Sequence, residues 1–255
     1  MKFIRFIDNE TNNRQGILTE NGIEEITGDI FDQWGKTGNI YPANEVRLIA
    51  PLEPRQIIGI GKNYVATEKD LPEKITDIPL FFLKSISSVI GPGEEIKIPK
   101  SGDEVKFESE LAVVIGKEMN QIDEDQVFDY IFGYTIANDV TSPQYFHKYG
   151  PWTLGKSFNT FTPLGPVIET ELDLAKIQVK AFLNEVKKQE SSINLMIITI
   201  SKMISFLSGI MTLKPGDVIL TGSPVGAGLL KPGDKIECEI DGIGSLVNQI
   251  VDSTK

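Results

Sequence analysis

Short apolar runs separated by turn residues constrain the fold of this chain more than any other feature. Helical periodicity is rare: the best segment is 199–212, where Ile200, Met203, Ile204, Leu207 and Met211 would share one face. Asp123 is a plausible N-cap for a shorter helix over 123–128. The runs expected to be strands are 3–7, 15–18, 57–60, 80–83, 106–115, 130–137 and 218–221. Because helices do not alternate with strands, we predict a β-rich α+β fold on a curved sheet, and not a doubly wound one.

The chain divides into two parts at a proline-rich connector. Pro51 and Pro54 bracket it, so we expect a small N-terminal β-rich domain over 1–52 and a larger domain over 53–255. Residues 62–76 contain many charges and few large apolar side chains, which is typical of a surface loop. We predict that this segment is a lid.

The sequence Lys-Pro-Gly-Asp occurs twice, at 214–217 and 231–234. Proline in the second position and glycine in the third position are typical of a type II turn. We therefore expect two such turns, each leading into a strand.

Composition excludes several classes of function. The formal net charge of −11 argues against nucleic acid and anionic membranes as partners. Cys238 is the only cysteine, so neither an intramolecular disulfide nor a thiolate metal cluster is possible. With one histidine, His147, zinc sites built from two or three histidines are excluded. Neither a signal peptide nor an apolar stretch of about 18 residues is evident, and we expect a cytoplasmic protein.

Three acidic residues form a candidate metal site. Alternation along a strand would place Glu108 and Glu110 on the same face, and Asp139 follows the next strong strand. Neighbouring carboxylates repel each other, and a divalent cation removes that conflict. Ligands that offer only oxygen favour Mg²⁺, Mn²⁺ or Ca²⁺ over zinc. The residues alone leave another interpretation open, in which the glutamates lie on a solvated edge strand and Asp139 is a turn residue.

Four ordered blocks make the chain resemble the fumarylacetoacetate hydrolase family over about 57–245. The blocks are Phe-Glu-Ser-Glu-Leu-Ala-Val-Val-Ile-Gly at 107–116, Gly-Tyr-Thr-Ile-Ala-Asn-Asp-Val-Thr at 133–141, Trp-Thr-Leu-Gly-Lys-Ser-Phe at 152–158 with Pro-Leu-Gly-Pro at 163–166, and Pro-Gly-Asp-Val-Ile-Leu-Thr-Gly-Ser-Pro at 215–224. The resemblance implies the mixed β-roll of that family, usually as a homodimer.

The resemblance also implies a chemistry. Mg²⁺ or Mn²⁺ would be bound by Glu108, Glu110 and Asp139, with Ca²⁺ as an ion that a crystal could contain instead. Lys156 would face the substrate, and Thr221 and Gly222 would line its pocket. Members of the family cleave, decarboxylate or isomerise 2-oxo and β-dicarbonyl acids through a stabilised enolate. We therefore expect a small 2-oxo acid as substrate.

The chain departs from the family pattern in two places. Hydrolytic members have a histidine and a glutamate where this chain has Thr67 and Asp70, and a threonine hydroxyl cannot act as a base near neutral pH. We keep Thr67, Asp70 and Glu68 as candidate catalytic residues of the lid. Ser-Pro-Gln at 142–144 stands where relatives often have Ala-Arg-Asp, and Gln144 is our candidate substrate-binding residue there.

Other interpretations follow from these losses. His147 could substitute for the missing histidine, although a surface role is the simpler interpretation. The protein could also be a degenerate family member that binds a metal and a 2-oxo acid without turnover. A structural Ca²⁺ site without substrate is a third interpretation.

Overall fold

The structure, a computed structural model, describes residues 1–74, 78–100, 103–147 and 151–253. Most of the regular structure is β-strand, as predicted. The N-terminal strands are β1 (Lys2–Ile7), β2 (Asn13–Thr19), β3 (Gly22–Gly28), β4 (Trp34–Tyr41) and β5 (Arg47–Ile49). They are followed by β6 (Ile57–Ile60), β7 (Phe81–Lys84), β8 (Val89–Ile90), β9 (Glu95–Ile98), β10 (Lys106–Phe107), β11 (Ser109–Ile115), β12 (Ile131–Asn138) and β13 (Thr162–Glu169). The remaining strands are β14 (Gln178–Leu183), β15 (Val186–Ser192), β16 (Val218–Leu220), β17 (Gly228–Leu229), β18 (Lys235–Ile240) and β19 (Gly244–Asp252).

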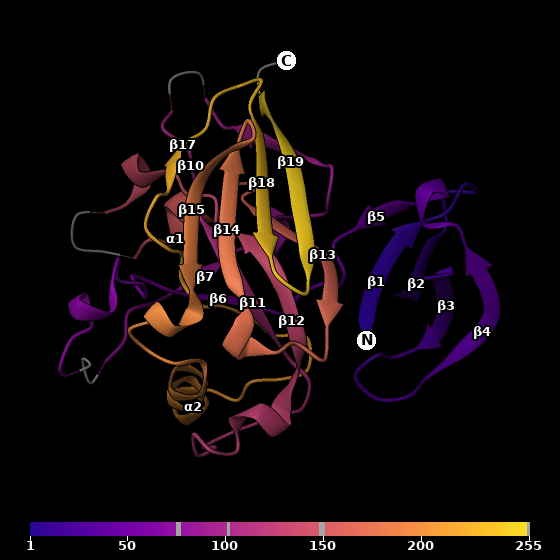
Figure 1. Ribbon diagram of the computed structural model, residues 1–255, viewed down its shortest axis with the longest axis horizontal. Coiled ribbons are helices and arrows are strands. Elements are labelled where there is room, and N and C mark those ends of the chain that lie inside the picture. The colour runs from indigo at the N-terminus through magenta and orange to yellow at the C-terminus, as the bar shows by residue number, and fades with distance from the viewer. Residues whose placement is uncertain (75–77, 101–102, 148–150, 254–255) are drawn as a thin grey trace.

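Two large sheets form the body of the molecule. A 12-stranded sheet has the order β4-β3-β2-β1-β13-β12-β11-β16-β6-β7, with β5 on β1 and β8 on β13. A five-stranded sheet has the order β15-β14-β18-β19-β9. In Figure 1 the strands β14, β18 and β19 lie across β11 and β12, and β1–β4 lie to one side. The sheet is therefore mixed, because β6 runs parallel to β16 while most other pairs are antiparallel.

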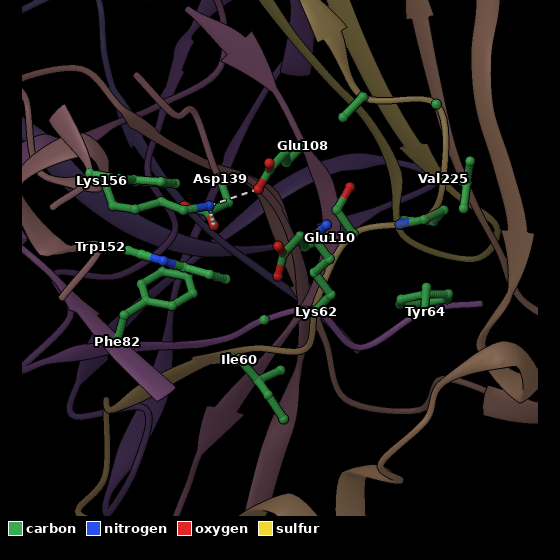
Figure 2. A pocket seen from close by; sticks show the side chains of 16 residues that line it. Ile60, Lys62, Tyr64, Phe82, Glu108, Glu110, Asp139, Trp152, Lys156 and Val225 are labelled. Carbon is green, nitrogen blue, oxygen red and sulfur yellow. Dashed lines mark hydrogen bonds and ion pairs between the residues drawn. The ribbon is translucent and has the colours of Figure 1, made fainter. Parts of the chain in front are cut away.

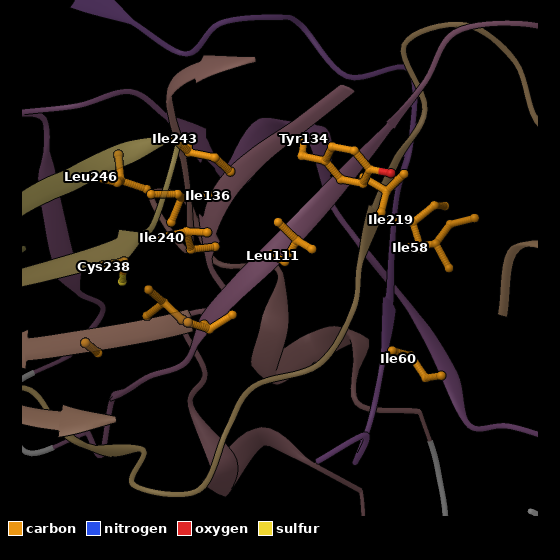
Figure 3. Close-up of a cluster of buried hydrophobic side chains, with 14 of the residues drawn as sticks. Ile58, Ile60, Leu111, Tyr134, Ile136, Ile219, Cys238, Ile240, Ile243 and Leu246 are labelled. Atoms are coloured by element: carbon orange, nitrogen blue, oxygen red, sulfur yellow. The ribbon is translucent and has the colours of Figure 1, made fainter. Parts of the chain in front are cut away.

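The main core lies between the two sheets. Leu111 and Ile136 of the large sheet contact side chains of the small sheet such as Ile240 and Leu246 (Figure 3). The opposite face of β11 is also apolar, because Ala112 and Val114 belong to a second buried cluster. A central strand that is buried on both faces needs apolar residues at consecutive positions, and this explains why residues 111–115 are all apolar.

The long helix α2 (Ile200–Ile210) is the one that periodicity predicted. Ile200, Met203, Ile204 and Leu207 are all buried, and the Thr199 side chain caps the helix by accepting from the Lys202 N–H. The other α-helix, α1 (Thr153–Lys156), is a single turn. Neither helix in the described ranges is long and apolar enough to cross a membrane.

The predicted helix over 123–128 is wrong. Residues 124–126 form a turn, and a 3₁₀ helix follows at Val127–Tyr130 before the chain enters β12. Six residues are too few to stabilise an α-helix, and here the Tyr130 carbonyl accepts the N–H groups of Gly116 and Lys117 across the sheet.

Both Lys-Pro-Gly-Asp sequences form the predicted turns. Gly216 has a φ of +85° and Gly233 a φ of +94°, as the third position of a type II turn requires. The Asp217 and Asp234 N–H groups each donate to the carbonyl of the lysine three residues earlier, at 3.0 Å. Each aspartate side chain in turn accepts from the N–H of that lysine.

The N-terminal strands carry a charged network of their own. Arg14 donates through Nε to Asp8 at 2.5 Å and through Nη1 to Glu25 at 2.6 Å. The guanidinium of Arg14 lowers the pKa of Asp8 to about 2. Thr37 and Asn39 also donate to Glu25, so the two carboxylates have several donors each.

Candidate active site

The three predicted carboxylates meet at one end of the large sheet. Strands β11 and β12 are antiparallel, and Glu110 pairs with Ala137, so the start of β11 lies beside the end of β12. Glu110 is in β11, and Asp139 directly follows β12. One oxygen each from Glu108, Glu110 and Asp139 lies within 4.8 Å of the others (Figure 2). The solvated-strand interpretation is wrong for Glu110 and Asp139, which are 2% and 0% exposed.

Glu108 occupies a break that the sequence did not predict. The expected single strand over 106–115 is divided here, because β10 pairs with β17 while β11 pairs with β12 and β16. The Glu108 N–H donates to the Asn138 side chain at 2.9 Å, and its carbonyl accepts the Asp139 N–H at 2.8 Å. These bonds replace the regular ladder and hold Glu108 next to Asp139.

Two lysines bind the carboxylates. Lys156, at the end of α1, donates to Glu108 Oε2 at 2.7 Å and to Asp139 Oδ2. Lys84, at the end of β7, donates to Asp139 Oδ1 at 2.6 Å and to the Val140 carbonyl at 3.3 Å. If all groups are ionised, three negative charges meet two positive ones, so the cluster keeps a net charge of −1.

Burial and charge set the protonation of these groups. Burial raises the pKa of Glu110, and the negative charges of Asp139 and Glu108 raise it further. Burial alone would also raise the pKa of Asp139, but the positive charges of Lys156 and Lys84 hold it below its usual value. Burial would lower the pKa of Lys156, yet the three carboxylates raise it. Lys156 is therefore a protonated, charged donor at neutral pH.

A cavity of about 500 Å³ opens over the cluster. Phe82, Phe146 and Trp152 form an apolar wall; the rings of Phe146 and Trp152 are stacked with centroids 5.4 Å apart. Lys156 Nζ lies 4.8 Å from the centroid of the Phe82 ring. In Figure 2 Phe82 and Trp152 are drawn on one side of the cluster, and Tyr64 and Val225 on the other. The volume is in the range typical of small-molecule sites.

The three candidate catalytic residues of the predicted lid are not in this cavity. Thr67, Glu68 and Asp70 are exposed, and none lines the cavity in the described part of the chain. Thr67 Oγ1 donates to Asp70 Oδ2 at 2.8 Å, and the Thr67 N–H donates to the same oxygen at 3.1 Å, which caps the 3₁₀ helix Glu68–Asp70. Two residues of the predicted lid, 75 and 76, lie outside the described residues.

The prediction that Thr221, Gly222 and Gln144 line the substrate pocket is wrong, because none of them is among the described residues that line the cavity. Thr221 Oγ1 donates to the Leu111 carbonyl, and the Gly222 N–H donates to Glu110 Oε2 at 2.7 Å. The segment after them, 223–227, lines the cavity. Gln144 and His147 are exposed and are not among the described residues that line it.

Sequence reasoning missed Lys84, Lys62 and Tyr64. Lys84 ends the apolar strand β7, and a lysine in that place gives a weak signal, because its partner Asp139 is 55 residues away. Lys62 and Tyr64 line the cavity from the start of the segment predicted to be a lid, where their residue types gave no signal of a role in the site.

The donor set fits a hard divalent cation. All three carboxylates offer oxygen, two of them are buried, and in their ionised forms they carry one negative charge more than the two lysines balance. The aromatic side chains give the cavity an apolar wall, and Lys156 supplies a positive charge beside the same space. Such an arrangement can stabilise negative charge on an oxygen of a bound substrate.

Comparison with known proteins agrees with this geometry. The sequence model described as fumarylacetoacetate (FAA) hydrolase C-terminal matches residues 56–251, and one described as Rv2993c-like, N-terminal, matches residues 1–51. The chain belongs to the fumarylacetoacetate hydrolase family. The family includes relatives named as a tautomerase, an isomerase and a hydrolase, and this protein is an enzyme too.

Three relatives show the range of the family. An oxaloacetate tautomerase of Xenopus laevis is 38% identical over 228 residues, which cover 84% of this chain and 71% of that protein. The crystal structure of a 5-carboxymethyl-2-hydroxymuconate delta-isomerase from Mycobacterium smegmatis has a TM-score of 0.91 and 35% identity, and covers 99% of this chain and 100% of its own. A maleylpyruvate hydrolase from Sphingobium, in complex with manganese(II) and pyruvate, has a TM-score of 0.82 and 28% identity, with 99% of both chains covered.

Proposed function

We propose that this protein is a divalent-metal-dependent enzyme that acts on a small 2-oxo or β-dicarbonyl acid through an enolate. The convergence of Glu108, Glu110 and Asp139 within 4.8 Å carries the proposal. Lys156 supports it, because its ammonium group lies against two of these carboxylates and also lines the cavity.

The carboxylates would hold the cation, and Lys156 would stabilise negative charge on the substrate. Glu108, Glu110 and Asp139 would hold the cation, which would polarise the 2-oxo group of the substrate when bound. Lys156 stays protonated because of its raised pKa, so it donates to the substrate and stabilises negative charge that develops on the oxo oxygen. Phe82 and Trp152 exclude water and strengthen these interactions.

Proton transfer is a better fit than hydrolysis. Hydrolysis needs an activated water, and the described cavity lining contains no histidine. Thr67 and Asp70 occupy the positions where hydrolytic members have a histidine and a glutamate, and here they form a hydrogen bond with each other at the surface. We therefore favour tautomerisation or isomerisation, with decarboxylation as a neighbouring outcome because it uses the same enolate. The names of the tautomerase and isomerase relatives support this choice.

Mg²⁺ or Mn²⁺ is the proposed cofactor. The oxygen-only donor set supports both ions, and the manganese(II) in the Sphingobium hydrolase supports Mn²⁺. A homodimer, implied by the family resemblance, stays a prediction that light scattering on the purified protein would test.

The deciding experiment measures metal-dependent turnover. Oxaloacetate, an acylpyruvate and a 2-hydroxydienoate are offered to EDTA-treated protein with and without Mn²⁺. We expect Mn²⁺-dependent keto–enol conversion of at least one, and loss of about 10²-fold or more in Glu110→Gln and Asp139→Asn. Glu20→Gln, at an exposed glutamate, is the matched control. Turnover that survives EDTA, or unchanged Mn²⁺ affinity in both site variants, would refute the metal site.

A catalytically degenerate binding protein is the second candidate. The capped Thr67–Asp70 pair favours it, because neither side chain reaches the cavity. Tight binding of oxalate by the Mn²⁺-loaded protein without conversion of any of the three substrates would support this candidate, whereas ready turnover would eliminate it.

A further inference from the structure

Gln189 connects the two sheets next to the candidate metal ligands. It lies in β15, at the edge of the five-stranded sheet, and is 1% exposed. Its Oε1 accepts the Ser109 N–H at 3.0 Å, and its Nε2 donates to the Pro224 carbonyl at 2.6 Å and to Ser223 Oγ at 2.8 Å. A reversed amide would lose both backbone bonds, so these two partners fix its orientation. One buried side chain therefore binds β11 on one side and, on the other, the segment 223–227 that lines the cavity.

The Gln189 amide occupies the place where β11 and β16 would otherwise continue to pair. The last bond of that ladder runs from the Thr221 N–H to the Leu111 carbonyl, at 3.1 Å. In the same antiparallel register Ser109 would lie opposite Ser223, where strand partners exchange backbone hydrogen bonds. Instead the amide lies between these two residues and supplies the acceptor for the Ser109 N–H. Gln189 thereby holds the two segments apart at the edge of the cavity.

Both ends of this bridge lead to a candidate metal ligand. Ser109 lies between Glu108 and Glu110 in the chain, so the bond that fixes its N–H also fixes the backbone from which both carboxylates extend. On the other side, the Gly222 N–H donates to Glu110 Oε2 at 2.7 Å, one residue before the segment that Gln189 binds. The position of that segment therefore determines whether Glu110 keeps this donor.

The segment bound by Gln189 also lies directly on the backbone of β15. A Cβ at Gly226 would collide with the carbonyl oxygen of Lys188, the residue before Gln189, so the two backbones are in contact. Gly226 has a φ of +112°, which residues with a side chain rarely adopt. Glycine at this position thus lets the segment approach β15 closely enough for the Gln189 amide to reach it.

We infer that Gln189 is a positioning residue of the proposed metal site: it holds β11 apart from the segment 222–224 and so keeps the two glutamate ligands in place. Gln189 acts only through these neighbours. None of its hydrogen bonds in the described part of the chain reaches a carboxylate, and it is not among the described residues that line the cavity. Groups that orient metal ligands indirectly contribute about 10–100-fold to metal affinity. The inference rests on the proposed function and adds to it a residue of the second sheet.

The test measures the affinity of the full-length, metal-free protein for Mn²⁺ by calorimetry. Gln189→Met keeps the length of the side chain and removes all three hydrogen bonds, so we expect Mn²⁺ to bind about tenfold more weakly. Gln189→Glu keeps an acceptor for the Ser109 N–H but sets a carboxylate oxygen against the Pro224 carbonyl, and we expect binding about threefold weaker. This second variant carries the test if Gln189→Met does not fold. The electron paramagnetic resonance spectrum of bound Mn²⁺ should change in both variants, because it depends on the arrangement of the ligands.

Asn248→Leu is the matched control. Asn248 is also 1% exposed in the five-stranded sheet, and its Nδ2 donates to the carbonyls of Gly91 and Glu94, none of which is among the described residues that line the cavity. This variant loses buried amide hydrogen bonds as Gln189→Met does, so its unfolding free energy in urea should fall comparably. Its Mn²⁺ affinity should stay within about twofold of the natural value, and its spectrum should not change.

The outcomes separate this inference from the proposed function. An equal loss of Mn²⁺ affinity in Gln189→Met and Asn248→Leu would trace the effect to global stability and overturn the positioning role. Natural affinity in every Gln189 variant that folds would overturn it as well, and the metal site would stand. A natural protein that does not bind Mn²⁺ would refute the metal site of the proposed function, and Gln189 would then have no ligands to position.

Discussion

Lys84 Nζ lies 2.6 Å from Asp139 Oδ1, and both side chains are completely buried. This contact joins the end of β7 to the end of β12. It occupies one oxygen of Asp139 and leaves the other on the side of Lys156. Lys84 thus orients a candidate metal ligand and balances part of its charge.

Replacing Lys84 by methionine should destabilise the metal-free protein by about 3–5 kcal/mol, because a buried carboxylate loses a partner that it cannot replace with water. Urea unfolding in EDTA measures the change. Lys97→Met, at an exposed lysine, is the control and should change the unfolding free energy by less than about 0.5 kcal/mol. A loss below about 1 kcal/mol in Lys84→Met would contradict the structural role.

Asn63→Asp keeps the shape of the side chain but removes its two N–H donors. The new carboxylate would face the carbonyls of Ile198 and Thr221, so we expect a loss of at least about 2 kcal/mol at pH 7. Protonation restores one donor, so the loss should be smaller near pH 4.5. Asn120→Asp, at an exposed asparagine, serves as the control. Equal stability of both variants at pH 7 would show that the hydrogen bonds of the Asn63 side chain do not stabilise the fold.

Asp8 should make the stability of the protein depend on pH in the acid range. Its folded pKa, about 2, is below the unfolded value of about 3.9, so its stabilising contribution is present above pH 4 and is lost as the pH falls towards 2. The stability difference between the natural protein and Asp8→Asn should therefore shrink from pH 6 to pH 2. Unfolding curves over this range measure it, with Asp32→Asn, at an exposed residue, as the control. A difference that is constant with pH would exclude the proposed contribution of Asp8.

Cys238 should be inert in the folded protein. It is 1% exposed, faces the core between the sheets (Figure 3), and burial raises its pKa to about 12. Because the thiolate is the reactive form, a disulfide reagent at pH 8 should label the native protein only as fast as it unfolds. In urea, labelling should be rapid and complete. Fast stoichiometric labelling without denaturant would place Cys238 at the surface.

Local patterns predicted local structure well. The expected strand over 57–60 is β6 without change, and Thr199, at the start of the expected helix 199–212, caps α2. The turns at 214–217 and 231–234 form because proline fixes φ at the second position and glycine can adopt the positive φ of the third. The helix over 123–128 does not form, because six residues give too few internal hydrogen bonds to offset the cost of starting a helix, and the chain makes a turn and the 3₁₀ helix Val127–Tyr130 instead.

The candidate site was predictable only in part. Glu108, Glu110 and Asp139 follow from strand alternation and the family resemblance, because antiparallel neighbours bring them together. The contact of Lys84 with Asp139, and the orientation of Gln189 towards Ser223, join residues 55 and 34 positions apart. No periodicity encodes such pairs, since they depend on how separate strands and loops pack.

The pairing of β1 with β13 makes the N-terminal strands difficult to remove. Lys2 pairs with Glu169 and Phe3 with Ile168, and the Met1 amino group donates to Glu169 at 3.0 Å. A truncated chain that began at residue 53 would present the bare edge of β13 together with apolar side chains that Phe3 and Ile17 now cover. Exposed edges of this kind recruit other chains and promote aggregation. Any attempt to trim this enzyme to its family core would therefore have to cap that edge first.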